Sequence, residues 1–311
     1  MSFKASAPGS LMLLGEYAVL YGKQALVCAV DQRIYVTVTP RHDDQVNIHS
    51  ERFGEYRTTL TDLEIQKPYS FVLGTLLQLK SKMRRGCDLY IESEFSDQIG
   101  FGSSSAVTVA TLAALITWLD IRMNANEMIR QSRLIVRRVQ GMGSGADVAA
   151  AVCGGMVAYQ PQPLVAEKLP SSFPITTFYA GFKTPTKEAV ASVLNRFSNH
   201  PDLLRSLCQS IGQCAFEGIA HARKGHFEKL GEVMNIQQGL MDALGVNLPV
   251  MQNIITYLRD QPGIVGAKIS GSGMGDCVVG LGDSFDDFHL ENGVKKIPVR
   301  MTLQGVQCDK L

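Results

Sequence analysis

Glycines and serines gather directly before an apolar segment that we expect to be a helix. Residues 100–105 read GFGSSS, and the chain stays almost wholly apolar from residue 106 to residue 119. Glycines let successive backbone amides turn inward, serine hydroxyls add hydrogen-bond donors, and the N-terminus of a helix carries partial positive charge. Such a loop can hold phosphate. An ordinary turn with a serine N-cap gives the same pattern, and the GK[ST] ending of a Walker loop is absent from the sequence.

Three further glycine-containing stretches carry polar residues. Residues 6–22 read SAPGSLMLLGEYAVLYG, residues 141–151 read GMGSGADVAAA, and residues 268–282 read KISGSGMGDCVVGLG. Taken singly, each has a structural explanation: the first is a strand with a turn at both ends, and the third is a β-hairpin turn. In the second, Asp147 follows a tight glycine turn and opens a helix, where aspartate is a good cap.

Strands and helices must hold these stretches in place. Alternating and β-rich segments predict strands over residues 24–40, 46–50, 56–60, 87–94 and 175–182, with a closing strand pair within 299–308. Helical patterns cover residues 104–119, 126–140, 147–153, 186–197, 203–223, 227–244 and 248–260. The elements lack the regular alternation of a doubly wound sheet. Pro161, Pro163 and Pro170 predict a domain boundary, with domains over residues 1–162 and 163–311.

The composition is that of a soluble globular enzyme. The chain has 311 residues, of which 45% are hydrophobic and 19% charged, and its net charge is +1. No basic field is present to attract nucleic acid or an acidic membrane. The seven cysteines form no CxxC pair, the N-terminus has no apolar signal core, and the longest apolar stretch is too short to span a membrane. We expect a cytoplasmic protein, and the sequence leaves a homodimer open.

All four glycine stretches occur in one chain in this order, and the combination resembles the GHMP kinases. This superfamily includes galactokinase, homoserine kinase, mevalonate kinase and phosphomevalonate kinase. APGSLMLLGEYAVLYG is similar to its first motif, GFGSSSA to its phosphate loop, GSGADVAAAVCGG to its catalytic-aspartate segment and KISGSGMGDC to its third motif. The resemblance covers nearly the whole chain. It is greatest to the isoprenoid branch: GEYAVLYGKQALVCAVDQRIYV is typical of mevalonate kinases and VQGMGSGADVAAAVCGGMVAY of phosphomevalonate kinases.

The resemblance implies an α+β fold of two domains. The N-terminal α/β domain would be like domain 2 of ribosomal protein S5, with an unusual left-handed β-α-β crossover. The C-terminal α+β domain would be ferredoxin-like. ATP and the acceptor would bind in the cleft between the two domains. Composition alone does not suggest this crossover, because such connections are nearly always right-handed.

The matching positions imply a role for each candidate site residue. In the family, the glycine and serine loop wraps the ATP phosphates, and Ser104 matches the serine whose hydroxyl approaches Mg²⁺. Asp147 matches the aspartate that accepts the proton of the substrate hydroxyl. The ATP-binding residues would be Gly100, Gly102, Ser103, Ser104 and Ser105. The acceptor side would be formed by Glu16, Thr186, Gly271, Ser272 and Gly273.

Two departures from the family pattern concern charged residues. Ser10 stands where the first motif usually has a lysine that lowers the pKa of the attacking hydroxyl. Val136 stands where mevalonate kinases have a metal-binding glutamate. Lys183 and Lys187, in GFKTPTKEAV, are candidate replacements for the lysine and complete the catalytic set with Asp147. The third loop also carries Met274 and Asp276 at positions where glycines are common.

The resemblance implies an ATP-dependent, Mg²⁺-requiring kinase that phosphorylates mevalonate, a small hydroxy acid, in isoprenoid biosynthesis. Phosphomevalonate kinase is the first alternative. Its substrate carries an additional phosphate, which would need basic residues in the pocket such as Arg137 and Arg138. Other metabolite kinases of the family, for sugars or homoserine, come next. A nucleotide-binding regulator without catalytic activity also stays open, and the missing lysine and glutamate favour it.

Overall fold

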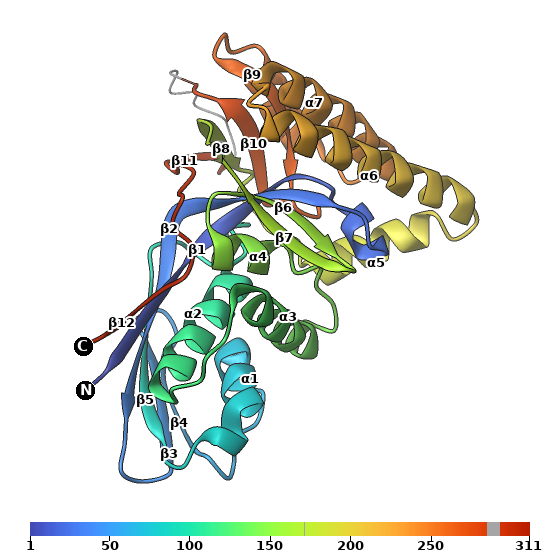
Figure 1. Cartoon of the computed structure of the whole chain (residues 1–311). Coiled ribbons are helices and arrows are strands. Elements are labelled where there is room, and N and C mark those ends of the chain that lie inside the picture. The colour runs from blue at the N-terminus through green and yellow to red at the C-terminus, as the bar shows by residue number, and fades with distance from the viewer. Residues whose placement is uncertain (171, 285–292) are drawn as a thin grey trace.

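Two β-sheets, each packed against helices, form the molecule (Figure 1). The computed structural model describes residues 1–170, 172–284 and 293–311. The strands are β1 (Phe3–Leu14), β2 (Ala25–Pro40), β3 (Gln45–Ser50), β4 (Gly54–Thr59), β5 (Cys87–Ser93), β6 (Met156–Pro161), β7 (Leu164–Leu169), β8 (Ile175–Tyr179), β9 (Ile264–Ser270), β10 (Cys277–Gly282), β11 (Lys295–Ile297) and β12 (Gln307–Lys310). The α-helices are α1 (Ser70–Leu79), α2 (Ser103–Trp118), α3 (Ala125–Gln140), α4 (Ala146–Cys153), α5 (Thr186–Arg196), α6 (Pro201–Arg223), α7 (Phe227–Leu244) and α8 (Pro249–Arg259).

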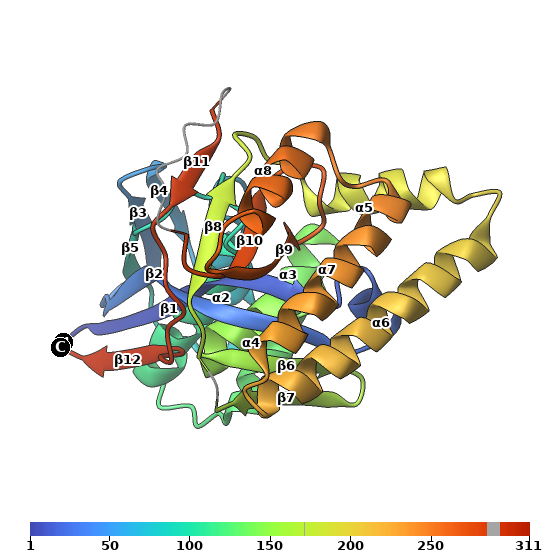
Figure 2. The same cartoon turned by 90° about the horizontal axis from the view of Figure 1, so that it is seen from above.

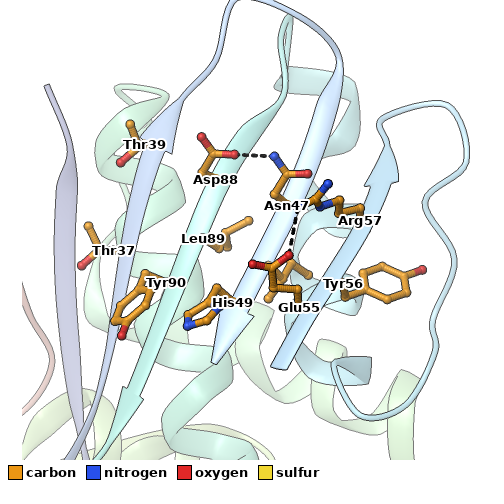
Figure 3. Close-up of a pocket in the computed structure, with 11 residues that line it drawn as sticks. Thr37, Thr39, Asn47, His49, Glu55, Tyr56, Arg57, Asp88, Leu89 and Tyr90 are labelled. Atoms are coloured by element: carbon orange, nitrogen blue, oxygen red, sulfur yellow. Dashed lines mark hydrogen bonds and ion pairs between the residues drawn. The ribbon is translucent and has the colours of Figure 1, made fainter. Parts of the chain in front are cut away.

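The first sheet is mostly antiparallel and has eight strands. Its order is β12-β1-β2-β5-β3-β4, with β6 paired to β2 and β7 paired to β6. The parallel pair is β3 and β5, and the chain between them runs through β4 and α1. In β2 the side chains alternate between the two faces: Val36 and Val38 are buried under the helices, whereas Thr37 and Thr39 lie on the opposite, open face (Figure 3).

Helix α2 forms the centre of the first domain. Nearly every residue from Ser105 to Ile116 is buried, because α2 packs on β1 and β2 with one side and on α1, α3 and α4 with others. A helix that is apolar all round is a core helix. The sequence prediction of a buried helix directly after the glycine and serine loop is therefore confirmed, and the burial fixes the position of the helix N-terminus.

The second sheet is antiparallel and has the order β11-β8-β10-β9 among the described residues. Figure 2 shows α6 and α7 side by side. Helices α7 and α8 pack on β9, whereas α6 also contacts β1 and β2 of the first sheet. Pro201 and Pro249 stand in the first turns of α6 and α8, where the missing N–H of proline costs nothing. Helices α2 and α4 pack on the first sheet and α7 and α8 on the second, which confirms the mixed α+β fold of two domains. The left-handed crossover stays a prediction.

The C-terminal segment departs from the sequence prediction. A strand pair within residues 299–308 was expected, but Met301 forms an isolated bridge to Val30, and β12 pairs with β1. The two termini therefore lie side by side at one end of the first sheet (Figure 1). Local alternation predicted a strand here, but it could not indicate a partner about 300 residues away. Strands β7 and β12 both join the first sheet, although they follow the expected boundary at residue 162, and that boundary stays a prediction.

The sequence analysis did not single out α1. Its residues 70–79 pack against α3, and Gly74 lies so close to this helix that an added Cβ would come within 3.0 Å of a Val139 methyl carbon. In the part of the chain that the structure describes, no helix is long and apolar enough to cross a membrane.

Candidate active site

The four glycine stretches meet at one cleft with a volume of about 720 Å³. Its walls come from both sheets and from the N-termini of α2, α4 and α5. Of the site residues predicted from the sequence, the cleft is lined by Glu16, Gly100, Gly102, Ser103, Ser104, Ser105, Asp147, Lys183, Thr186, Lys187, Gly271 and Ser272. Gly273 is not a lining residue, because it packs against Val246 from the loop before α8.

The candidate phosphate loop is fixed by a backbone hydrogen bond to β1. Phe101 is fully buried, and its carbonyl oxygen accepts a hydrogen bond from the Ser10 amide at 3.0 Å. Gly102 then takes a left-handed conformation with a φ of 62°, which turns the chain into α2. None of the described side chains caps the first turn of this helix. The Ser105 and Ala106 amides donate to the Gly102 carbonyl oxygen, which leaves the Ser103 and Ser104 amides and the positive end of the helix dipole for an anion in the cleft.

Asp147 stands opposite this loop, in the first turn of α4. The helix starts after Gly145, whose φ is 94°, and the Ser10 hydroxyl donates a hydrogen bond of 2.8 Å to Asp147 Oδ1. Burial raises the pKa of Asp147 above its usual range, while the Ser10 hydrogen bond and the charge of Lys183 lower it. Ser10 thus holds the carboxylate instead of supplying a cation, and Asp147 is placed to accept a proton inside the cleft.

Lys183 reaches the cleft from the loop between β8 and α5. The ammonium nitrogen donates a 3.0 Å hydrogen bond to the carbonyl oxygen of Asp97, and its charge acts on both Asp147 and Asp276. Lys187 also lines the cleft but is exposed, in the first turn of α5. Of the two candidate replacements for the missing lysine, Lys183 is the one whose charge acts on the carboxylates.

Asp276 is a cleft residue that the sequence analysis noted as unusual but did not assign. Its side chain is 7% exposed, and burial raises its pKa to about 6, an effect that the charge of Lys183 opposes. An added Cβ on Gly100 would come within 2.8 Å of the Asp276 Cβ, so the third loop rests directly on the phosphate loop. The departure from glycine at this position was the signal that could have identified it.

Glu16 is engaged in a buried network that joins the two domains. Its Oε1 is 2.5 Å from the Lys268 ammonium nitrogen, and Oε2 accepts a 2.5 Å hydrogen bond from Gln237. Lys268 is fully buried and also donates to the Ile269 carbonyl oxygen. Burial lowers the pKa of Lys268, and the Glu16 charge opposes this shift. Although Glu16 lines the cleft, its carboxylate is already occupied, which does not favour the predicted contact with an acceptor.

The third loop, which comes directly after β9, is hydrogen-bonded to Glu16 and to its neighbour Tyr17. The Gly271 amide donates to Glu16 at 3.4 Å, and the Tyr17 hydroxyl donates to the Ser272 carbonyl oxygen at 2.6 Å. The Ser270 and Ser272 hydroxyls are buried and have no hydrogen-bond partner among the described residues. Both serines line the cleft. They are therefore donors that a bound molecule can use.

The donor set fits a Mg²⁺ ion carried by ATP better than a metal held by the protein alone. In the described ranges no group of three or more histidine, cysteine, aspartate or glutamate side chains converges on one point. The Ser104 hydroxyl and the carboxylates of Asp147 and Asp276 line the cleft together, and the Asp276 Oδ1 atom is buried without a partner among the described residues. In proteins, Mg²⁺ is commonly bound by one or two carboxylates together with phosphate oxygens of the substrate. Val136 lines the cleft too, but its apolar side chain cannot bind a metal.

A second depression, of about 260 Å³, lies on the open face of the first sheet (Figure 3). Its side chains largely pair with one another: Asn47 donates to Asp88 at 2.7 Å, and Arg57 donates to Glu55 at 2.9 Å. None of the four glycine stretches contributes to it. It is the solvated polar side of the sheet, and the candidate chemistry lies in the larger cleft.

Comparisons with known proteins identify the family. The family model described as the GHMP kinases N terminal domain matches residues 70–155, and the GHMP kinases C terminal model matches residues 215–292. A mevalonate kinase of Pyrococcus abyssi is 32% identical over 296 residues, which are 89% of this chain and 88% of that protein. The chain therefore belongs to the GHMP kinases, enzymes that transfer a phosphoryl group to a hydroxyl group.

Within that family, mevalonate kinases of Thermococcus sibiricus and Pyrococcus furiosus are 30% and 31% identical and cover 90% of this chain and 89% of their own length. Solved structures share the fold at lower identity. The mevalonate kinase of Methanococcus jannaschii superimposes with a TM-score of 0.75 at 18% identity and covers 96% of this chain and 98% of that one. The Lin0012 protein of Listeria innocua has a TM-score of 0.86 at 20% identity, with full coverage of both chains.

Proposed function

We propose that this chain is a mevalonate kinase that transfers the γ-phosphoryl group of ATP to the hydroxyl group of mevalonate. The observation that carries the proposal is the grouping of Asp147, Ser10 and Lys183 opposite the N-terminus of α2. The amides of the loop and of the first turn of α2 bind the phosphates. The acceptor lies between this loop and the third loop.

In the reaction, the acceptor oxygen attacks the γ-phosphorus while the bond from that phosphorus to the β-phosphate oxygen breaks. The proton of the hydroxyl group passes to Asp147, and ADP leaves. Phosphoryl transfer needs mainly positioning and charge neutralisation, which the loop and the lysine supply. Mg²⁺, when bound with ATP, would neutralise the phosphate oxygens, with Ser104 as its protein ligand. Lys183 compensates for the lysine that Ser10 replaces, because its charge favours the ionised forms of neighbouring groups.

Phosphomevalonate is the second candidate acceptor, because several basic side chains line the cleft. Lys67, Arg133 and Lys187 join Lys183 in its walls, and Arg133 Nε is buried without a partner among the described residues. Arg137 and Arg138, which were considered for this role from the sequence, do not line the cleft. A carboxylate needs one such cation and an additional phosphate needs more, so the number of cations is compatible with either acceptor.

A coupled assay of ADP release tests the proposal. The enzyme is supplied with Mg²⁺-ATP and, in separate reactions, mevalonate, phosphomevalonate, galactose or homoserine, with a reaction lacking acceptor as the blank. We expect the highest kcat/KM with mevalonate. A higher value with phosphomevalonate would assign the second candidate. ADP release at the blank rate with every acceptor, together with tight ATP binding, would favour the catalytically inactive regulator.

The remaining sequence predictions extend this proposal. The enzyme would act in the cytoplasm, without nucleic-acid partners, and size-exclusion chromatography with light scattering would decide between a monomer and a homodimer.

A further inference from the structure

A buried carboxylate without a hydrogen-bond partner faces the phosphate loop. Asp276 is 7% exposed and lines the cleft, and its Oδ1 atom has no partner among the described residues. A buried carboxylate that is neither paired nor hydrogen-bonded is costly, so such a group indicates a missing ligand. Its backbone is well fixed, because the Asp276 amide donates to the Phe182 carbonyl oxygen and its own carbonyl oxygen accepts from Ala180.

Two carboxylates flank the same short piece of loop. An added Cβ on Gly100 would lie 3.2 Å from Asp276 Oδ2, and one on Gly102 would lie 3.2 Å from the Asp147 carboxyl carbon. These glycines are two residues apart and directly precede Ser103 and Ser104 at the start of α2. The loop therefore has two carboxyl groups packed against it at the point where we expect the phosphates of ATP.

The charges at this point are not balanced by the protein. Lys183 acts on both Asp147 and Asp276, so one ammonium group is shared between two carboxylates. Triphosphate oxygens add further negative charge when ATP binds. A divalent cation between the carboxylates and the phosphates removes this repulsion, and Mg²⁺ is commonly held by one or two carboxylates plus phosphate oxygens.

We propose that Asp276 is a ligand of the Mg²⁺ ion that accompanies ATP, in place of the carboxylate that Val136 cannot provide. The ion would be shared with Ser104, and Asp147 would stay free to accept the proton. The proposal rests on the phosphoryl-transfer function but not on the identity of the acceptor. It also explains the glycine at position 100, since any side chain there would displace the Asp276 carboxyl group.

Direct metal binding tests this role without any turnover. The wild-type enzyme and Asp276→Asn are saturated with the non-hydrolysable ATP analogue AMPPNP, and Mn²⁺ is titrated with detection of the free ion by electron paramagnetic resonance. Asparagine has the same size and tolerates the positive φ of 66° at this position. We expect the Mn²⁺ affinity of the complex to fall at least about tenfold, because the ligand charge is lost. The affinity for metal-free AMPPNP should be retained or increased.

Two further variants make the outcome decisive. Asp276→Gly also suits the backbone and removes the ligand completely, so it replaces the asparagine variant if that one does not fold. Asp260→Asn removes an exposed carboxylate at the end of α8 and serves as the matched control. Mn²⁺ affinities within about twofold of wild type in both Asp276 variants would overturn the proposal. A parallel loss of metal-free AMPPNP binding would also overturn it, because Asp276 would then only shape the loop.

Discussion

At the scale of single residues, Asp147 is the group that we propose as the base of the reaction. Asp147→Asn keeps the size of the side chain and its position beside Ser10 but removes the base. We expect kcat to fall by about 10²–10⁴-fold, the usual contribution of a general base. AMPPNP affinity, measured by calorimetry, should change little. Retention of more than about a tenth of the wild-type kcat would leave Asp147 with only a structural role at the start of α4.

Lys183 is expected to be the cation of the site. Lys183→Met keeps most of the side-chain length and removes the charge that acts on Asp147 and Asp276. We expect kcat to fall about tenfold or more, and the acid limb of the pH–rate profile should move to higher pH, because the carboxylate pKa values rise. Lys187→Met should lose less, since Lys187 is exposed. Steady-state kinetics of the two variants would measure these losses of kcat, with Lys229→Met at an exposed position on α7 as the control. Wild-type kinetics in both cleft variants would exclude a compensating lysine.

The Asp276 carboxyl group also links stability to pH. Its pKa of about 6 in the folded protein lies above the ordinary value of 3.8. Between these values the folded chain binds a proton that the unfolded chain has lost, so this group stabilises the fold less as the pH rises. Above both values, Asp276→Asn should therefore raise the free energy of unfolding of the metal-free protein by about 1–3 kcal/mol, and at about pH 4 by little.

Urea denaturation with EDTA at the two pH values measures this effect. The same gain at both would show that the asparagine variant acts through packing, and a loss at neutral pH would mean that the carboxylate is paired in the folded state.

At the scale of elements, the turn into α2 depends on glycine for two separate reasons. Gly102 has a φ of 62°, and an added Cβ would come within 2.6 Å of the Ser10 hydroxyl oxygen. Gly22 has a φ of 82°, with no atom near its added Cβ. Gly22→Ala should therefore cost only the left-handed strain, about 1–2 kcal/mol. Gly102→Ala should cost more and also weaken AMPPNP binding, because the Ser10–Asp147 contact and the loop must move.

Thermal unfolding and AMPPNP calorimetry on both variants would compare these costs. Equal losses of stability with unchanged nucleotide affinity would show that the loop conformation at Gly102 does not matter for binding.

At the scale of the whole molecule, the Glu16–Lys268 pair joins the first sheet to the second. Glu16 follows β1, whereas Lys268 lies on β9 with its side chain fully buried. Lys268→Met leaves a buried carboxylate without its cation, which commonly costs about 3–5 kcal/mol. The double variant Glu16→Gln with Lys268→Met should be more stable than the sum of the single losses predicts, because it leaves no unpaired charge.

A double-mutant cycle of unfolding free energies measures this coupling. Lys4→Met, at the exposed pair with Glu92, is the control and should cost about 0–1 kcal/mol. Additive losses at Glu16 and Lys268 would mean that the buried pair does not hold the domains together.

The sequence alone determined the parts of this protein that depend on local spacing. The apolar run after GFGSSS predicted the buried helix α2, and the glycines before Asp147 predicted a turn into a short helix. Both features could be predicted because helix burial and left-handed turns depend on the types of residues within a few positions of one another. The family resemblance then ordered the four stretches around one cleft, and the structure brings them together there.

Only the tertiary structure decided which side chains are free to act. It pairs Glu16 with Lys268 across 252 positions, packs Asp276 against Gly100, and brings Lys183 into the range where its charge acts on Asp147. It also sends β12 back to β1 instead of into a local strand pair. None of these contacts follows from periodicity, because each depends on how two separately formed sheets pack. That packing decides whether a carboxylate is neutralised by the protein or left for a ligand.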